Sequence, residues 1–208
     1  MSGAPEEIVV RPAREADLDT IAAIQEAAIL ALAAGAYTPD QLAAWARVGI
    51  ETRHGLLGQG SFFVAEIRGQ TVGVAGWSAD GGDRSGAWIR YVFVRPDAVR
   101  KGIGRRLMAA VEVSARGAGR SVFHVWSSLN ATAFYQALGY RRRRAIRVPL
   151  GRGLEMSGMH MVKQGAPISN EQLRGMLPKP ERPATIEEMD EAIAQEAIER
   201  YLRSTSKP

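Results

Sequence analysis

Apolar residues recur along the chain with two periods, and the change from one period to the other predicts alternating strands and helices. Spacings of three and four residues are typical of helices that cover a core. They mark residues 18–34, 40–48, 105–116, 130–138 and 186–201. Runs rich in β-branched and aromatic residues, closed by Gly or Pro, are typical of strands. They mark residues 8–10, 62–67, 71–77, 87–95, 121–126, 140–148 and 154–163. The order of these elements predicts a mixed α/β fold.

The composition changes after residue 164. Four prolines fall between residues 165 and 183, which is typical of a linker. Thr185, followed by an acidic first turn, then predicts a capped amphipathic helix. A lone helix of this length is only marginally stable in water, so it needs a surface to cover: its own body, a dimer mate or another protein. We therefore expect one domain over residues 1–164 and a linker with a helical tail over residues 165–208.

Composition and charge narrow the classes of function. The chain has no cysteine and three histidines, which excludes disulfides and Cys-ligated metals and makes any metal site an unexpected feature. No charged-then-apolar leader opens it, and Gln25 and Glu26 interrupt its longest apolar helical stretch, so we expect a cytoplasmic protein without a membrane span. The net charge is +5, and the excess of acids after residue 164 leaves +7 on residues 1–164. A basic body suits an anionic cofactor or a nucleic acid.

A glycine-rich turn between a strand and a helix is the strongest local signal. The apolar run 91–94 ends at Pro96, which cannot continue a central strand, and Gly102 and Gly104 then precede the helix of residues 105–116. Free amides and the dipole of a helix start attract anions, and glycine lets a phosphate come close to the backbone. Taken alone, Gly-x-Gly fits a plain tight turn equally well. Positive charge surrounds the turn through Arg100, Lys101, Arg105 and Arg106.

Two motifs in the correct order give the turn a more specific meaning. Leu107 stands where a dinucleotide-binding loop needs a third glycine, and no Gly-Lys-Ser/Thr follows. Residues 94–108, VRPDAVRKGIGRRLM, resemble the acetyl-CoA signature of the GCN5-related N-acetyltransferases (GNAT). Residues 130–140, NATAFYQALGY, resemble the second motif of that family. The resemblance covers about residues 8–164.

The resemblance implies a fold, a cosubstrate and a set of site residues. The fold would be a mostly antiparallel central sheet with one splayed parallel strand pair, flanked by helices and followed here by the helical tail. A β-bulge within 92–94 would open the slot for acetyl-CoA, and no metal is implied. Val99 departs from the Gln or Arg that the family usually carries there. The implied cofactor-binding residues are Val92, Phe93, Val94, Arg100, Lys101, Gly102, Ile103, Gly104, Arg105 and Asn130, with Tyr135 as the general acid.

The sequence alone identifies neither the general base nor the site that binds the acceptor. Candidate bases are Glu66, Asp83 and His124, and an ordered water or an amine that arrives neutral would serve instead. Acceptor choice is expected to lie on segments that flank the slot in this fold. These are residues 37–39, Trp45, the loop 80–86 and the turn 151–153. Tyr37 and Trp45 fit core packing as well, and Asn130 fits a helix N-cap.

The predicted function is transfer of an acetyl group from acetyl-CoA to a small amine or a protein amino group. One alternative is a GNAT-shaped protein that binds a toxin or another partner, because residues 177–201 resemble the C-terminal tails of AbrB-type antitoxins. Another is a toxin that acetylates aminoacyl-tRNA. The arginines 141–144 alternate between the two faces of a strand and lack an aromatic stacking platform, so a nucleic-acid partner is not expected. A homodimer is left open.

Overall fold

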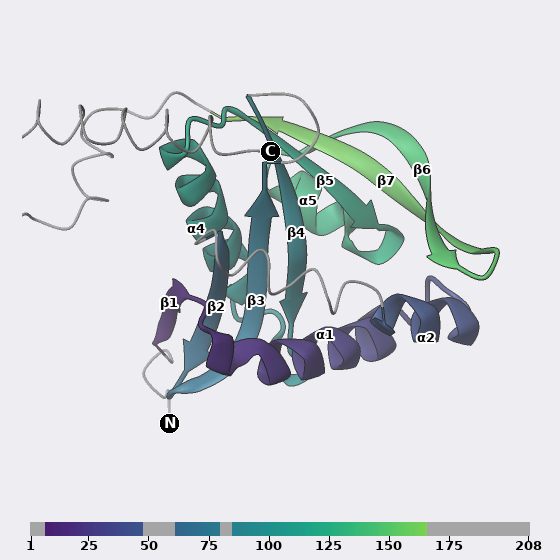
Figure 1. The fold of residues 1–208 in the computed structure, drawn as a ribbon, viewed down its shortest axis with the longest axis horizontal. Coiled ribbons are helices and arrows are strands. Elements are labelled where there is room, and N and C mark those ends of the chain that lie inside the picture. The colour runs from purple at the N-terminus through teal and green to yellow at the C-terminus, as the bar shows by residue number, and fades with distance from the viewer. Residues whose placement is uncertain (1–6, 48–60, 80–84, 166–208) are drawn as a thin grey trace, which may run out of the picture. The chain divides into compact units, whose positions relative to one another are not determined.

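The computed structural model describes residues 7–47, 61–79 and 85–165. Within them lies one seven-stranded sheet with the order β1-β2-β3-β4-β5-β7-β6 (Figure 1). Its neighbouring strands are antiparallel except for the parallel pair β4 and β5. The predicted mixed fold, with one parallel pair, is confirmed. The strands are β1 (Ile8–Pro12), β2 (Phe62–Ile67), β3 (Gln70–Ser78), β4 (Gly86–Val94), β5 (Val122–Ser128), β6 (Arg141–Gly151) and β7 (Leu154–Gln164).

Helices cover both faces of the sheet. Side chains of α4 and α5 join one core cluster with the strands, whereas α1 and α2 pack against the opposite face in two further clusters. Among the described helices, none combines the length and the apolar character needed to cross a bilayer. The helices are α1 (Leu18–Leu32), α2 (Pro39–Arg47), α4 (Ile103–Gly117) and α5 (Thr132–Ala137).

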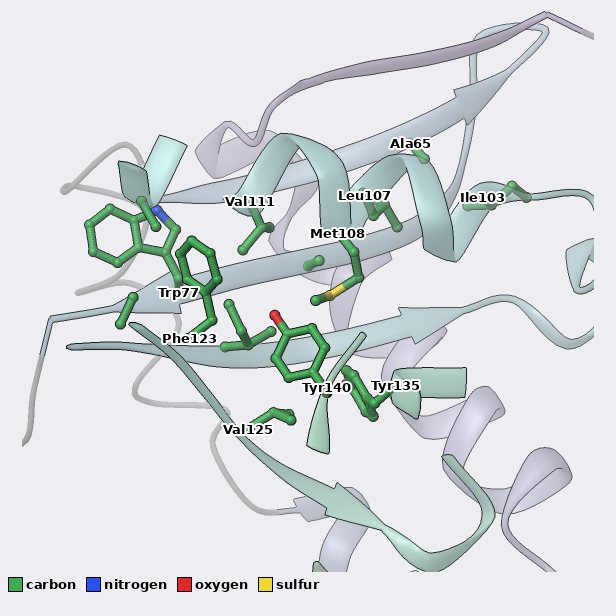
Figure 2. Close-up of a cluster of buried hydrophobic side chains, with 14 of the residues drawn as sticks. Ala65, Trp77, Ile103, Leu107, Met108, Val111, Phe123, Val125, Tyr135 and Tyr140 are labelled. Carbon is green, nitrogen blue, oxygen red and sulfur yellow. The ribbon is translucent and has the colours of Figure 1, made fainter. Parts of the chain in front are cut away.

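The core beneath α4 follows from the helical spacing seen in the sequence. Leu107, Met108 and Val111 are buried and face the strands (Figure 2). Ala115 is buried in the same cluster. Full burial of side chains such as Leu or Val stabilises a fold by about 2 kcal/mol each. Figure 2 shows Tyr135 and Tyr140 close together beside this core. This packing fixes the start of α4 and α5 against the middle of the sheet.

A charged cluster fixes the other face at the start of α1. The guanidinium of Arg11 donates to Asp17 at 2.7 and 2.8 Å and to Glu66 at 2.6 Å. The Arg14 amide also donates to Asp17. Asp17 is buried, and its bonds to Arg11 hold the pKa of its carboxyl below the ordinary value. The cluster ties β1 and β2 to the entry of α1.

Several predicted boundaries are wrong by a few residues. Helix α4 begins at Ile103, two residues early, because Gly102 adopts a φ of +83° and forms the N-cap. Residues 129–131 form a short 3₁₀ turn, so α5 begins at Thr132. Strand β6 continues to Gly151. The predicted linker after Gly165 and the last helix lie outside the described residues, as do Asp83 and most of the loop 80–86.

Candidate active site

The parallel strands β4 and β5 part in the middle of the sheet. They pair from Gly86 with Val122 to Ile89 with Val125. On its other side β4 pairs with β3, where the register shifts by one residue between Phe93 and Arg90. Tyr91 lies inside this shift with a φ of +53°, an uncommon backbone conformation for a large side chain. Such a β-bulge bends its strand, which accounts for the parting of β4 from β5.

A cavity of about 1070 Å³ occupies the place where the strands part. Its lining comes from both faces of the sheet, so the cavity crosses the sheet. We call the part lined by α4, α5 and the loop 98–102 the α4-side half. The part lined by α1, α2 and the β6–β7 hairpin is the α1-side half. Two molecules can therefore meet in one cavity from opposite faces.

The edge of β4 is open within this cavity. Val92 and Val94 pack toward the α4 cluster, whereas Phe93 packs with α1 and α2. All three line the cavity, and β5 does not pair with any of them. An extended chain can bind such an edge as an added strand.

The start of α4 presents unbonded amides to the same cavity. The first bond of the helix runs from the Arg106 amide to the Gly102 carbonyl at 3.1 Å, so the amides of residues 103–105 come before it. A Cβ built on Gly104 would lie 3.1 Å from the ring of Phe134. A bare backbone therefore suits this position. Arg100, with a φ of +65°, and Arg105 also line the cavity.

Lys101 does not line the large cavity, unlike the other predicted cofactor-binding residues. It lines a separate cavity of about 230 Å³ together with Arg68, Arg95 and Asp97. The other predicted cofactor-binding residues all line the large cavity. Val99 lines it as well, so the departure from the family pattern falls inside the site. The cavity thus gathers a helix start and an open strand edge, which together suit a diphosphate joined to an extended arm.

Tyr135 lies at the α4-side half of the cavity. It is buried, and burial raises the pKa of its hydroxyl. Its ring packs edge-on against Tyr140, with ring centres 5.6 Å apart. Tyr140 has a different role, because its hydroxyl donates to Glu112 at 3.1 Å and its ring is absent from the cavity wall. Glu112 is buried too and accepts two bonds from Lys163 at 2.7 and 2.9 Å.

Asn130 and Tyr37 connect the helices of the α1 face to the end of β5. The side-chain amide of Asn130 donates to the Leu32 carbonyl at 3.0 Å, so Asn130 closes the end of α1. It is not the N-cap of α5, which is Ala131. The hydroxyl of Tyr37 accepts from the Leu129 amide and donates to the Ser157 carbonyl. Both residues hold the wall of the cavity, and Asn130 lines it.

Two of the candidate bases, Glu66 and His124, do not line the cavity. Glu66 of β2 is bonded to Arg11 of β1, and Asp83 is outside the described residues. His124 stacks on Trp88 and lies 3.2 Å from His160, nitrogen to nitrogen. Burial and the nearby charge of His124 lower the pKa of His160. Among the described residues, no Asp, Glu or His side chain lines the cavity, and no cluster of three or more such side chains is placed to hold a metal ion.

Trp126 is a large, exposed residue of the cavity wall that was not among the residues predicted from the sequence. It is 50% exposed and lines the cavity where β5 leaves β4. The signal was present in the alternation of β5, because Phe123 and Val125 are buried and Trp126 falls on the opposite face. Of the predicted acceptor residues, Trp45 lines the cavity, whereas Tyr37 and the turn 151–153 do not.

Comparison with known proteins agrees with this geometry. Residues 58–142 match the family model of the acetyltransferase (GNAT) domain. An uncharacterized N-acetyltransferase from Methanocaldococcus jannaschii is 30% identical over 93 residues. The match covers 41% of this chain and 41% of that relative, so the chain spans less than half of the relative's length.

Solved structures cover more of the chain. A GCN5-related N-acetyltransferase from Rhodopseudomonas palustris is 28% identical with a TM-score of 0.66, over 79% of this chain and 98% of its own. The ribosomal-protein-alanine N-acetyltransferase from Brucella melitensis is 27% identical with a TM-score of 0.58. The match covers 75% of this chain and 99% of that protein. YncA from Salmonella typhimurium, solved with its cofactor acetyl-CoA, is 26% identical with a TM-score of 0.55. The match covers 78% of this chain and 98% of that protein. Residues 58–142 thus match the GNAT acetyltransferase domain, and the described part of the chain has the fold of these solved GNAT structures.

Proposed function

We propose that the protein transfers the acetyl group of acetyl-CoA to the nitrogen of a primary amine. One observation carries the proposal: the cavity crosses the sheet where β4 and β5 part. A donor held on the α4 side and an amine on the α1 side would then meet at one point. Holding two reactants in contact supplies much of the rate of such a transfer.

The α4-side half fits the donor. The amides of residues 103–105 and the side chains of Arg100 and Arg105 would hold the diphosphate. The open edge of Val92–Val94 would hydrogen-bond the pantetheine arm as an added strand does. Asn130, whose amide nitrogen holds α1, lines the same half. Binding of a related protein to acetyl-CoA supports this assignment.

Acetyl-CoA, when bound, supplies an activated acetyl thioester and a thiolate leaving group. The amine nitrogen bonds to the acetyl carbon as the carbon–sulfur bond breaks, so one proton leaves the nitrogen and one reaches the sulfur. Tyr135 stays protonated at neutral pH because burial raises its pKa. Its hydroxyl is therefore a proton donor to the sulfur as charge develops there. We assign the proton of the amine to cavity water, since among the described residues no Asp, Glu or His side chain lines the cavity.

The acceptor is either a small amine or a protein amino group. A relative named for the alanine of a ribosomal protein makes a protein N-terminus one candidate. The partner-binding alternative rests on residues 177–201, which lie outside the described part of the chain. The alternative of a tRNA-acetylating toxin rests on the basic charge alone, and the arginines 141–144 are exposed on the edge strand β6.

The test combines binding and turnover. Calorimetry with coenzyme A should give saturable binding, and purified protein should release free thiol from acetyl-CoA only when an accepted amine is added. Small amines, peptides with free N-termini and aminoacyl-tRNA form the panel. Turnover restricted to aminoacyl-tRNA would favour the toxin alternative. Absence of coenzyme A binding would overturn the proposed function.

A further inference from the structure

The α1-side half of the cavity has an apolar and aromatic wall. The wall draws on α1, α2 and three strands, and its large side chains are Ile29, Leu32, Trp45, Phe93, Trp126 and Met156. Four of them also belong to, or pack against, the cluster that joins α1, α2 and the β6–β7 hairpin. The wall is therefore part of the folded body and is formed before any ligand binds.

Two tryptophans give this wall fixed aromatic surfaces. Trp45 packs edge-on against Tyr37 at 5.8 Å between ring centres and lies 6.2 Å from Phe93. Trp126 packs edge-on against Trp88 at 5.3 Å, yet half of its surface remains exposed. Rings held in this way can stack on a ligand with little loss of conformational entropy.

The charges of the wall are unsuited to a polycation. The polar side chains of this half are Gln25, Ser78, Arg90, Tyr91 and Ser128. Among the described lining residues there is no carboxylate, and the guanidinium of Arg90 lies 5.7 Å from the ring centre of Trp126. Within the described part of this wall, a second positive charge on the acceptor would find no carboxylate as a counter-ion. A neutral apolar group would be favoured by burial.

We propose that the acceptor is a small primary amine carried on a neutral aromatic group, which stacks on the wall formed by Trp45 and Trp126. This inference rests on the proposed acetyl transfer and adds the chemical class of the acceptor. The amine nitrogen would point toward the parted strands, and the aromatic group would cover the exposed face of Trp126.

The experiment compares amines at saturating acetyl-CoA by the release of free thiol. We expect kcat/KM for 2-phenylethylamine to exceed that for spermidine and for ethylamine by about 30- to 100-fold, which corresponds to burial of one aromatic ring. Trp126→Ala should remove most of this preference, because kcat/KM for 2-phenylethylamine should fall much further than that for ethylamine. Leu30→Ala is the matched control, because Leu30 is 45% exposed but does not line the cavity.

Binding gives a second readout that does not depend on turnover. Calorimetry with the product N-acetyl-2-phenylethylamine should show binding to the wild type and to Leu30→Ala and weaker binding to Trp126→Ala. Equal or better use of spermidine, or an equal loss with all amines in Trp126→Ala, would overturn the inference. Turnover of peptides but of no small amine would also overturn the inference, although the proposed acetyl transfer would then stand. Loss of coenzyme A binding in the wild type would instead overturn the proposed function itself.

Discussion

The hydroxyl of Tyr37 accepts a hydrogen bond of 2.7 Å from the backbone amide of Leu129, 92 residues away in the sequence. The same hydroxyl donates to the Ser157 carbonyl at 2.8 Å. One side chain thus joins the connection between α1 and α2 to the end of β5 and to β7. These are the segments that flank the α1-side half of the cavity.

Tyr37→Phe should therefore destabilise the protein. It leaves a partly buried amide and a partly buried carbonyl without their partner, which costs about 1–3 kcal/mol. Urea denaturation measures the loss. Thr38→Ser is the neighbouring control, because it keeps the hydroxyl that accepts from the exposed Gln41 amide at 3.3 Å. An equal loss in both variants would mean that Tyr37 does not hold these segments together.

Tyr135→Phe should lower kcat by about 10²- to 10⁴-fold, the usual contribution of a general acid. The dissociation constant for coenzyme A should change little, because the ring and its packing are kept. Tyr140→Phe is the matched control: this second buried tyrosine lies 5.6 Å away, but its hydroxyl bonds Glu112 instead of facing the cavity. It should reduce stability and leave turnover within about threefold. Equal effects on turnover would remove Tyr135 as the acid.

The pH profile tests the assignment of the amine proton to water. With no enzymic base, kcat/KM should rise with pH up to the pKa of the acceptor, which is about 8 for an α-amino group and about 10 for a lysine-type amine. The midpoint should therefore move when the acceptor is changed. A midpoint that stays near or below pH 6.5 with both amines would point to the His124–His160 pair, since the pKa of His160 is lowered.

The sequence predicted the fold well where local chemistry decides the structure. Pro96, Gly102 and the spacing of Leu107, Val111 and Ala115 determine where β4 ends and how α4 packs. The side-chain placements depend on distant segments and escaped prediction. Asn130 bonds the end of α1 instead of capping its own helix, and Glu66 is bonded to Arg11. Lys101 lines a different cavity, and its neighbours Arg100 and Gly102 adopt positive φ angles that the sequence pattern did not indicate.

Gly104→Asp should abolish most of the binding of coenzyme A. Its carboxylate would stand among the amides of residues 103–105 and repel the diphosphate, and its Cβ would press on Phe134. We expect calorimetry to show affinity reduced by about 100-fold or more. Gly117→Asp adds the same charge to the far end of the same helix, where a Cβ meets nothing within 4 Å. If both variants bound coenzyme A equally well, the diphosphate site would lie elsewhere.

Asp17 should make stability depend on pH in the acid range. The pKa of its carboxyl in the folded protein lies below the ordinary value because Arg11 donates two bonds to it. The ionised carboxylate therefore contributes stability above the unfolded pKa, and this is lost as the pH falls through the folded pKa. Asp17→Asn should lower the unfolding free energy at pH 7 by about 2 kcal/mol and flatten its fall below pH 5. Asp97→Asn removes a partner of Arg95 whose pKa is also lowered, but this pair is exposed and screened by water, so the acid profile should change much less than in Asp17→Asn. A parallel shift of the whole curve in Asp17→Asn would show that the carboxylate acts through packing and not through its charge.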